Sequence, residues 1–95
     1  MPYVARLGDW CSGHQCFPPR QTNEGSPNVY VNGRSFHRVG DYWPIHRCGD
    51  SKHSGRLAEG SSTVFVNSKP AGRQGDPVNC GSAVITGSPN VFCGG

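Results

Sequence analysis

The chain has few of the residues that build a hydrophobic core, and it has no long apolar segment. Only 17 of its 95 residues are Leu, Ile, Val or Phe, whereas Gly and Pro together number 22. No stretch approaches the roughly 20 apolar residues of a membrane-spanning helix, and no window shows a helical period. We therefore expect one all-β domain over residues 1–95, with a source of stability besides its core.

Strong charge of one sign is also missing. Nine Lys and Arg against six Asp and Glu give a net charge of +3, and the basic residues are spread singly along the chain. Nucleic-acid-binding surfaces usually cluster such residues, so we expect no nucleic-acid partner. Residues 1–6 lack the basic segment and apolar block of a signal peptide. We therefore expect synthesis in the cytoplasm and export, if any, by another route.

The five cysteines do not fit a disulfide scaffold, because their count is odd and a cytosolic chain keeps its thiols reduced. Together with four histidines they indicate a metal site instead. Disorder is disfavoured, because disordered chains usually combine low hydrophobicity with a high net charge.

Two short motifs each occur three times, which indicates an internal repeat. The first motif is Arg-x-Gly-Asp, with copies 32 and 35 residues apart at Arg6-Leu7-Gly8-Asp9, Arg38-Val39-Gly40-Asp41 and Arg73-Gln74-Gly75-Asp76. The second is a β-type run opened by Gly-Ser, at residues 25–33, 60–68 and 87–95. Because Gly-Asp is ordinary turn chemistry, we interpret the Arg and Asp residues as structural pairs rather than as recognition residues.

The repeats predict three equivalent β-hairpins. In the first, residues 29–31 and 34–39 flank Asn32-Gly33, which favours a type I′ turn. In the second, residues 63–66 and 69–74 flank the less ideal Asn67-Ser68. The third is split between residues 90–93 and 3–7, so we expect the two termini to lie side by side. Three such hairpins around a pseudo-threefold axis leave no long unpaired edge; an open β-meander is the alternative.

A potential metal ligand follows each Gly-Asp at a nearly constant offset. His14 lies five residues past Asp9, His46 five past Asp41, and Cys80 four past Asp76. His53, in the longest loop at residues 42–59, can supply a fourth ligand. Three imidazoles and one thiolate form a closed tetrahedral set typical of structural zinc. One zinc ion, bound by His14, His46, His53 and Cys80, would stabilise a thinly cored chain.

Other assignments remain open at this point. Iron or nickel also binds such ligands, and a cysteine-rich set drawn from Cys11, Cys16, Cys48 and Cys80 competes for the metal. We expect His37 to be a surface or inter-strand residue. Cys93 stands where Val31 and Val66 stand in the other repeats, so we expect it to be buried.

The motifs together resemble the PAAR-repeat family, named for Pro-Ala-Ala-Arg. That name is echoed by Pro70-Ala71-Gly72-Arg73, and the runs at residues 25–33, 60–68 and 80–89 carry the resemblance over the whole chain. Gly72 and Ser68 depart from the family pattern. The resemblance implies a small cone with zinc near its apex, held by three histidines and one cysteine.

The resemblance also implies a function, which is mechanical. One such cone caps a trimeric β-helical spike of a contractile injection machine, meets the target membrane first, and has no catalytic residues and no small-molecule substrate. The setting is a bacterial phage tail tip or a type VI secretion system, where the partner is a VgrG-type trimer. Because both termini belong to the repeat and no effector domain is fused, we favour the phage virion.

Two rival functions use the same residues. A zinc-dependent hydrolase needs an open coordination position and a nearby general base, and the sequence shows neither. A zinc-dependent nucleic-acid-binding module needs a recognition helix and a basic face, which are also missing. We therefore expect the metal to be structural.

Overall fold

The computed structural model describes all residues 1–95, and they form an all-β cone without a helix. No helix is therefore available to span a membrane. Four antiparallel pairs of strands make up the regular structure: β1 (Trp10–Cys11) with β2 (Arg20–Gln21), β3 (Tyr30–Val31) with β4 (Arg34–Ser35), β5 (Tyr42–Cys48) with β6 (Ser51–Arg56), and β7 (Phe65–Val66) with β8 (Lys69–Pro70).

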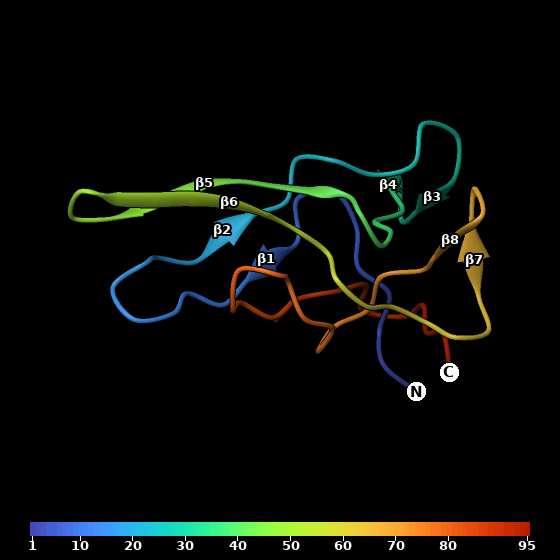
Figure 1. Cartoon of the computed structure of the whole chain (residues 1–95). Helices are drawn as coiled ribbons and strands as arrows, with labels where there is room; N and C mark the ends of the chain where they lie inside the picture. Colours follow the sequence, from blue (N-terminus) through green and yellow to red (C-terminus); the bar gives the residue numbers. More distant parts are fainter.

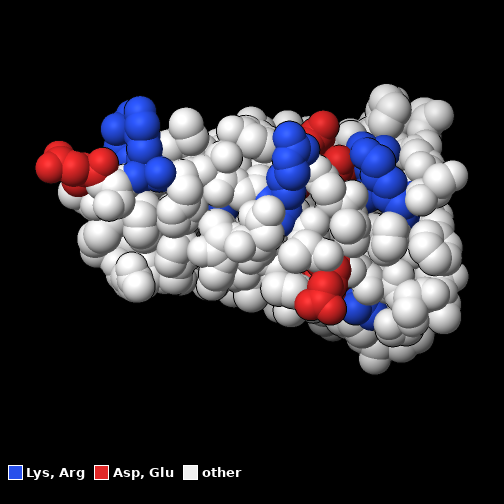
Figure 2. All heavy atoms as spheres, viewed as in Figure 1, with Lys and Arg blue, Asp and Glu red and all other residues white.

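The molecule is elongated, with extents of 38 × 24 × 22 Å. The β3–β4 and β7–β8 hairpins and both chain termini lie at one end, which we call the wide end, and the β5–β6 hairpin reaches the other, which we call the tip (Figure 1). Lys and Arg side chains stand apart from one another on the face in Figure 2. That face carries no broad basic patch.

The three expected hairpins are present at the wide end. Asn32 and Gly33 have φ angles of 54° and 77°, and Asn67 and Ser68 have 53° and 67°, so both turns need two positive φ angles. In the split hairpin, Tyr3 bridges to Phe92. The termini therefore lie side by side as predicted (Figure 1).

The strands of these hairpins are shorter than predicted, two residues in each arm of β3–β4 and β7–β8. The reason is that the second strand of each hairpin leaves its partner strand after two residues and then pairs with a segment of a neighbouring repeat. Isolated bridges record this exchange at Arg6–Phe36, Arg38–Ala71 and Val4–Arg73.

A closed ring of backbone hydrogen bonds marks the pseudo-threefold axis. Ala5 N–H donates to Gly72 C=O (2.9 Å), Gly72 N–H to His37 C=O (2.8 Å), and His37 N–H to Ala5 C=O (3.0 Å). Each of these residues precedes the Arg of one repeat. The ring confirms the closed arrangement and excludes the open meander.

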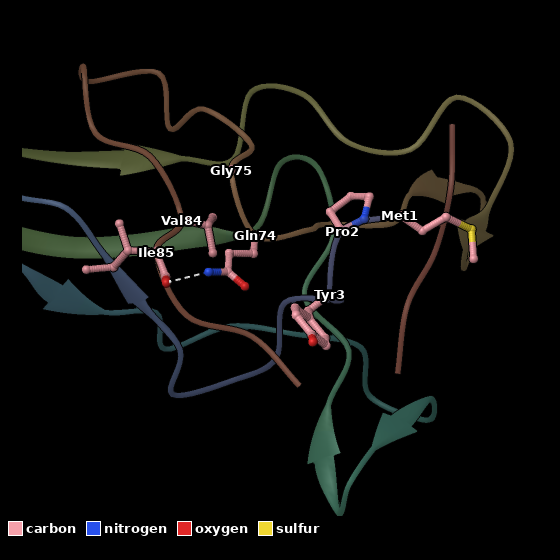
Figure 3. A pocket seen from close by; sticks show the side chains of 7 residues that line it. All are labelled: Met1, Pro2, Tyr3, Gln74, Gly75, Val84 and Ile85. Atoms are coloured by element: carbon pink, nitrogen blue, oxygen red, sulfur yellow. Dashed lines mark hydrogen bonds between the residues drawn. The ribbon is translucent and has the colours of Figure 1, made fainter. Parts of the chain in front are cut away.

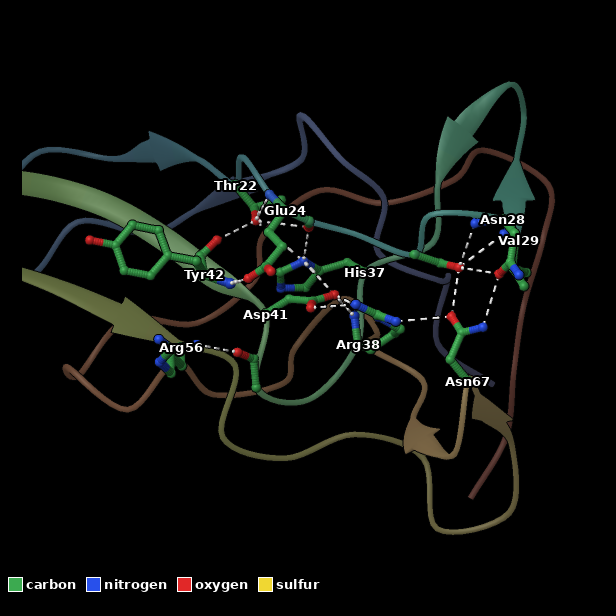
Figure 4. Close-up of polar contacts among 12 residues, drawn as sticks. Thr22, Glu24, Asn28, Val29, His37, Arg38, Asp41, Tyr42, Arg56 and Asn67 are labelled. Atoms are coloured by element: carbon green, nitrogen blue, oxygen red, sulfur yellow. Dashed lines mark hydrogen bonds and ion pairs between the residues drawn. The ribbon is translucent and has the colours of Figure 1, made fainter.

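The Arg and Asp residues of each repeat form bidentate pairs that are buried in two repeats and partly buried in the third, as the structural interpretation predicts. Arg38 donates from its backbone N–H and Nε to Asp41 Oδ2 (2.8 and 2.9 Å), and from Nη2 to Oδ1 (2.9 Å) (Figure 4). This hydrogen bonding to Asp41 raises the pKa of Arg38. Equivalent contacts join Arg6 with Asp9 and Arg73 with Asp76.

The same arginines connect one repeat to the next. Asn67 Oδ1, at a hairpin turn, accepts hydrogen bonds from Arg38 Nη1 (2.9 Å) and Ser26 Oγ (2.6 Å) (Figure 4). The equivalent acceptors are Asn32 Oδ1, bonded by Arg6 and Ser88, and the Gly94 carbonyl, bonded by Arg73 and Ser61. Every hairpin turn is therefore tied to a neighbouring repeat.

The core consists of two small clusters. One, at the wide end, contains Val4, Val31, Phe36, Val66, Ala71 and Cys93; the other, towards the tip, contains Ala5, Cys11, Trp43, Leu57, Val78 and Val84. The burial predicted for Cys93 is confirmed, and that burial raises the pKa of its thiol.

Two sequence expectations need correction here. The predicted loop at residues 42–59 contains the longest hairpin of the molecule, β5–β6. Its pattern is irregular because Pro44, which has no N–H for a ladder, coincides with a register shift between Trp43 and His46. His37 is an inter-strand residue, but it is fully buried rather than on the surface, and burial lowers its pKa.

The flank of the cone carries a shallow groove beside the N-terminus. Figure 3 shows Met1, Pro2 and Tyr3 on one side, and Gln74 donating from Nε2 to the Ile85 carbonyl (2.9 Å) on the other. Gln74 also donates its backbone N–H to the Tyr3 carbonyl (2.8 Å). The split repeat is thereby fixed to its neighbours on this side as well.

Candidate metal centre

The four residues that the sequence singles out come together in space. One ligand atom from each of His14, His46, His53 and Cys80 lies within 4.8 Å of all the others. His14 belongs to the loop between β1 and β2, His46 to β5, His53 to β6, and Cys80 to the segment after the third Gly-Asp. The group can therefore hold a metal ion, and it contains no carboxylate.

Local backbone structure sets the direction of each imidazole. His46 and His53 are paired in the β5–β6 register, which places them side by side across the hairpin. His14 is fixed by two backbone hydrogen bonds with Phe17 (3.1 and 2.9 Å). His46 Nδ1 lies 2.8 Å from the Pro18 carbonyl, which can only accept a hydrogen bond. A neutral His46 therefore keeps its proton on Nδ1 and presents a free Nε2 lone pair to the cluster.

The Nε2 atoms of His14, His46 and His53 lie so close together that hydrogen bonds alone cannot satisfy all three. His53 Nε2 lies 2.7 Å from His46 Nε2 and 3.1 Å from His14 Nε2. A neutral ring nitrogen carries either one proton or one lone pair, so His53 Nε2 pairs well with only one neighbour. A cation that accepts all three lone pairs removes this conflict. The donor set therefore fits a metal ion.

Desolvation favours the neutral form of two of these rings. Desolvation lowers the pKa of His46, and desolvation together with the nearby His14 and Arg20 lowers the pKa of His53. Neutral imidazoles are the metal-binding form of histidine.

Two further residues of the site were missed in the sequence. The ring of buried Phe17 lies 4.9, 4.8 and 4.3 Å from the rings of His14, His46 and His53, which restricts their motion. Arg20 donates from Nη2 to Cys80 Sγ (2.8 Å), which fixes the position of that sulfur. Phe17 lies in the loop between β1 and β2, and Arg20 is the first residue of β2. Neither has a repeated counterpart, so the repeat pattern could not reveal them.

The other cysteines do not join this group. Cys16 and Cys48 form a disulfide with a Cα–Cα distance of 5.2 Å. The expectation of reduced thiols is therefore wrong for this pair: both stand seven residues past the Asp of their repeats, and the pseudo-symmetry brings them together. Cys11 is buried in the core cluster towards the tip. The cysteine-rich ligand set is thus not assembled.

The fold and the site define a class of protein: a small all-β cone of three hairpin repeats, with a histidine and cysteine group able to hold a metal. The family comparison gives the same result, because the sequence profile of the PAAR motif matches residues 13–86. The chain belongs to the PAAR motif family.

Three curated relatives are bacterial toxins. The NAD(P)(+) glycohydrolase toxin Tse6 and the (p)ppApp synthetase toxin Tas1, both of Pseudomonas aeruginosa, are 39% identical to this chain in an alignment 85 residues long that covers 75% of this chain. The double-stranded DNA deaminase toxin A of Burkholderia cenocepacia is 37% identical over 70 residues, which cover 72%. The matched region is 18% of each Pseudomonas toxin and 5% of the Burkholderia toxin.

Proposed function

We propose that this chain is the tip of a trimeric spike in a contractile injection machine, with one chain on each trimer. The observation that carries the proposal is the wide end, where three equivalent hairpins from a single chain surround one axis. A threefold surface made by one chain can match the end of a homotrimer without a symmetry conflict.

The wide end also exposes an apolar surface with the same symmetry. Tyr30, Phe65 and Phe92 occupy equivalent positions in the three hairpins and are 61%, 57% and 46% exposed. Of the valines in these hairpins, Val31 and Val66 are buried, whereas Val29 and Val91 are 37% and 36% exposed. Exposed apolar groups of this kind commonly mark protein interfaces. We assign the aromatic set to docking on the spike.

The tip in this proposal is a structural element that pierces the target membrane. The metal is zinc, held by His14, His46, His53 and Cys80, because four nitrogen and sulfur donors form a closed tetrahedral set. The role of the ion is to contribute folding free energy where the core is thin. We propose no catalytic role for these residues.

The relatives support a structural rather than an enzymatic role for the shared segment. Their names describe three different reactions, yet all three proteins contain this same segment. A segment common to a glycohydrolase, a synthetase and a deaminase serves something other than any one reaction. Because these relatives are bacterial toxins, a type VI secretion system with a VgrG-type trimer is favoured over the phage tail that the sequence suggested.

A binding experiment with matched variants tests this function. In this proposal the chain is made in the bacterial cytoplasm. For the test, the purified chain is mixed with spike trimers encoded in the same genome, and calorimetry measures the stoichiometry and affinity of the complex. We expect one chain per trimer, and a loss on the order of 100-fold or more for the triple variant Tyr30→Ser, Phe65→Ser, Phe92→Ser. Ile45→Ser, which changes an equally exposed residue on β5, is the control. Equal losses in both variants, or no complex, would contradict the proposal.

A further inference from the structure

The disulfide between Cys16 and Cys48 joins the two loops that carry the first two histidines of the metal centre. Cys16 lies two residues after His14, and Cys48 lies two residues after His46. The sequence separation of the two cysteines is 32, the same as the spacing of the first two Arg-x-Gly-Asp motifs. The bond therefore connects equivalent positions of two repeats directly beside the ligands.

The disulfide is not part of the proposed ligand group, and solvent can reach it. Neither cysteine belongs to the four-residue metal group. Cys16 is exposed and Cys48 is half-buried, so soluble thiols and disulfides can reach the bond. Cys16 also precedes Phe17, the ring that contacts all three imidazoles. A change at this bond is thus transmitted to the ligands through short, direct connections.

We propose that the Cys16–Cys48 disulfide is a redox-controlled lock on the metal centre. When the bond is formed, it holds the loops of His14 and His46 together and slows loss of the metal. When the bond is reduced, the two loops move independently and the metal exchanges faster. This inference rests on the zinc site of the proposed function.

The lock closes by thiol–disulfide exchange with a small disulfide such as oxidised glutathione. The Cys16 thiolate attacks one sulfur of that disulfide, which forms a mixed disulfide and releases one glutathione thiolate. The Cys48 thiolate then attacks the Cys16 sulfur and releases the second glutathione. The protein loses two protons and two electrons, and the oxidant is reduced to two thiols. A reducing cytosol opens the lock, and an oxidising compartment closes it.

Thermodynamic reciprocity distinguishes this lock from a disulfide that merely stabilises the chain. If the bond strengthens zinc binding by some factor, zinc must favour the bond by the same factor. A disulfide that acts only on the unfolded chain would leave the affinity of the folded protein for zinc unchanged. Zinc affinity and disulfide formation must therefore be measured against each other.

The first arm measures zinc release from the full chain to a chromogenic chelator. The proteins are oxidised wild type, reduced wild type, the double variant Cys16→Ser, Cys48→Ser, and the control Cys93→Val, which removes a distant buried thiol at a position where the other repeats have valine. We expect release about 10-fold faster or more from the reduced protein and the double variant, and an unchanged rate for Cys93→Val. Equal rates in oxidised and reduced wild type would overturn the lock.

The second arm titrates the disulfide with glutathione redox buffers, with and without bound zinc, and quantifies free thiols by alkylation and mass spectrometry. We expect zinc to shift the midpoint towards the disulfide by the same factor by which the disulfide raises the equilibrium affinity for zinc, which is measured by competition with the chelator. A midpoint unaffected by zinc, or free Cys16 and Cys48 in oxidising buffer, overturns the lock alone. A wild-type chain that binds no zinc overturns the proposed metal centre as well, so the two failures are distinguishable.

Discussion

The wide end and the tip of this molecule are stabilised in different ways. At the wide end the same contacts occur three times: a bidentate Arg–Asp pair, a serine Oγ that accepts the backbone N–H three residues later, and a turn acceptor bonded by a neighbouring repeat. At the tip, each repeat contributes a segment of different length, and only one contains a long hairpin. The wide end preserves the pseudo-threefold symmetry, and the tip abandons it.

The proposed metal centre offers a reason for the broken symmetry. Three repeats supply three members of the group at equivalent positions, which are His14, His46 and Cys80. A closed tetrahedral site needs a fourth ligand, and a threefold arrangement has none to offer. The elongated β5–β6 hairpin supplies it, because its register places His53 opposite His46. The asymmetry of the tip is therefore what the proposed four-ligand site would need.

The largest expected effect comes from removing one proposed metal ligand, which should destabilise the tip before the wide end. His46→Ala should abolish zinc binding and lower the melting temperature by more than about 15 °C, because structural zinc contributes on the order of 10 kcal/mol in small domains. Elemental analysis and calorimetry measure both effects. Hydrogen exchange should show that protection is lost first around β5–β6 and last at the axis ring.

A histidine outside the centre provides the control for this experiment. His37→Gln changes a buried ring and should cost stability, but the variant should retain one zinc per chain. Loss of zinc from both variants would mean that metal content follows general folding rather than ligation by His46.

The second effect acts at the wide end and uses the three Arg–Asp pairs. Asp41→Ala leaves the buried Arg38 guanidinium without its partner and should cost about 3–5 kcal/mol of unfolding free energy. Asp76→Ala should cost less, because its pair is more exposed, with side chains 14% and 9% accessible against 7% and 0%. Urea denaturation measures the difference. Equal costs would show that solvent exposure does not set the strength of these pairs.

The third effect concerns the axis that joins the two regions. A Cβ added at Gly72 would lie 2.7 Å from Leu57 Cδ2 and 2.9 Å from the His37 carbonyl oxygen. Gly72→Ala should therefore cost about 1–3 kcal/mol in thermal or urea unfolding, although the name motif of the family has alanine there. A neutral result would show that Leu57 and the axis ring can move apart without loss.

The contrast between the regions also explains what the sequence could predict. The hairpin turns, the meeting of the termini and the burial of Cys93 follow from motifs that occur three times, so each copy supported the others. The grouping of His14, His46, His53 and Cys80 was also predicted, because three of them stand at a nearly constant offset from Gly-Asp. Phe17, Arg20 and the β5–β6 hairpin have no repeated copy, and the Cys16–Cys48 bond depends on a distance that sequence does not contain. Prediction was reliable where the molecule is symmetric and poor where it is not.

The smallest expected effect tests whether the hairpins of the wide end are energetically equivalent. Ser68 and Gly33 occupy the same turn position, with φ angles of 67° and 77°. A side chain costs about 1 kcal/mol or more in this left-handed region, and no atom lies within 4 Å of a Cβ added at Gly33. Ser68→Gly should therefore stabilise the protein by about 1 kcal/mol, and Gly33→Ser should destabilise it by a similar amount, both measured by thermal unfolding. Shifts of the same sign in the two variants would mean that neighbouring contacts, rather than backbone strain, determine the choice of residue at these turns.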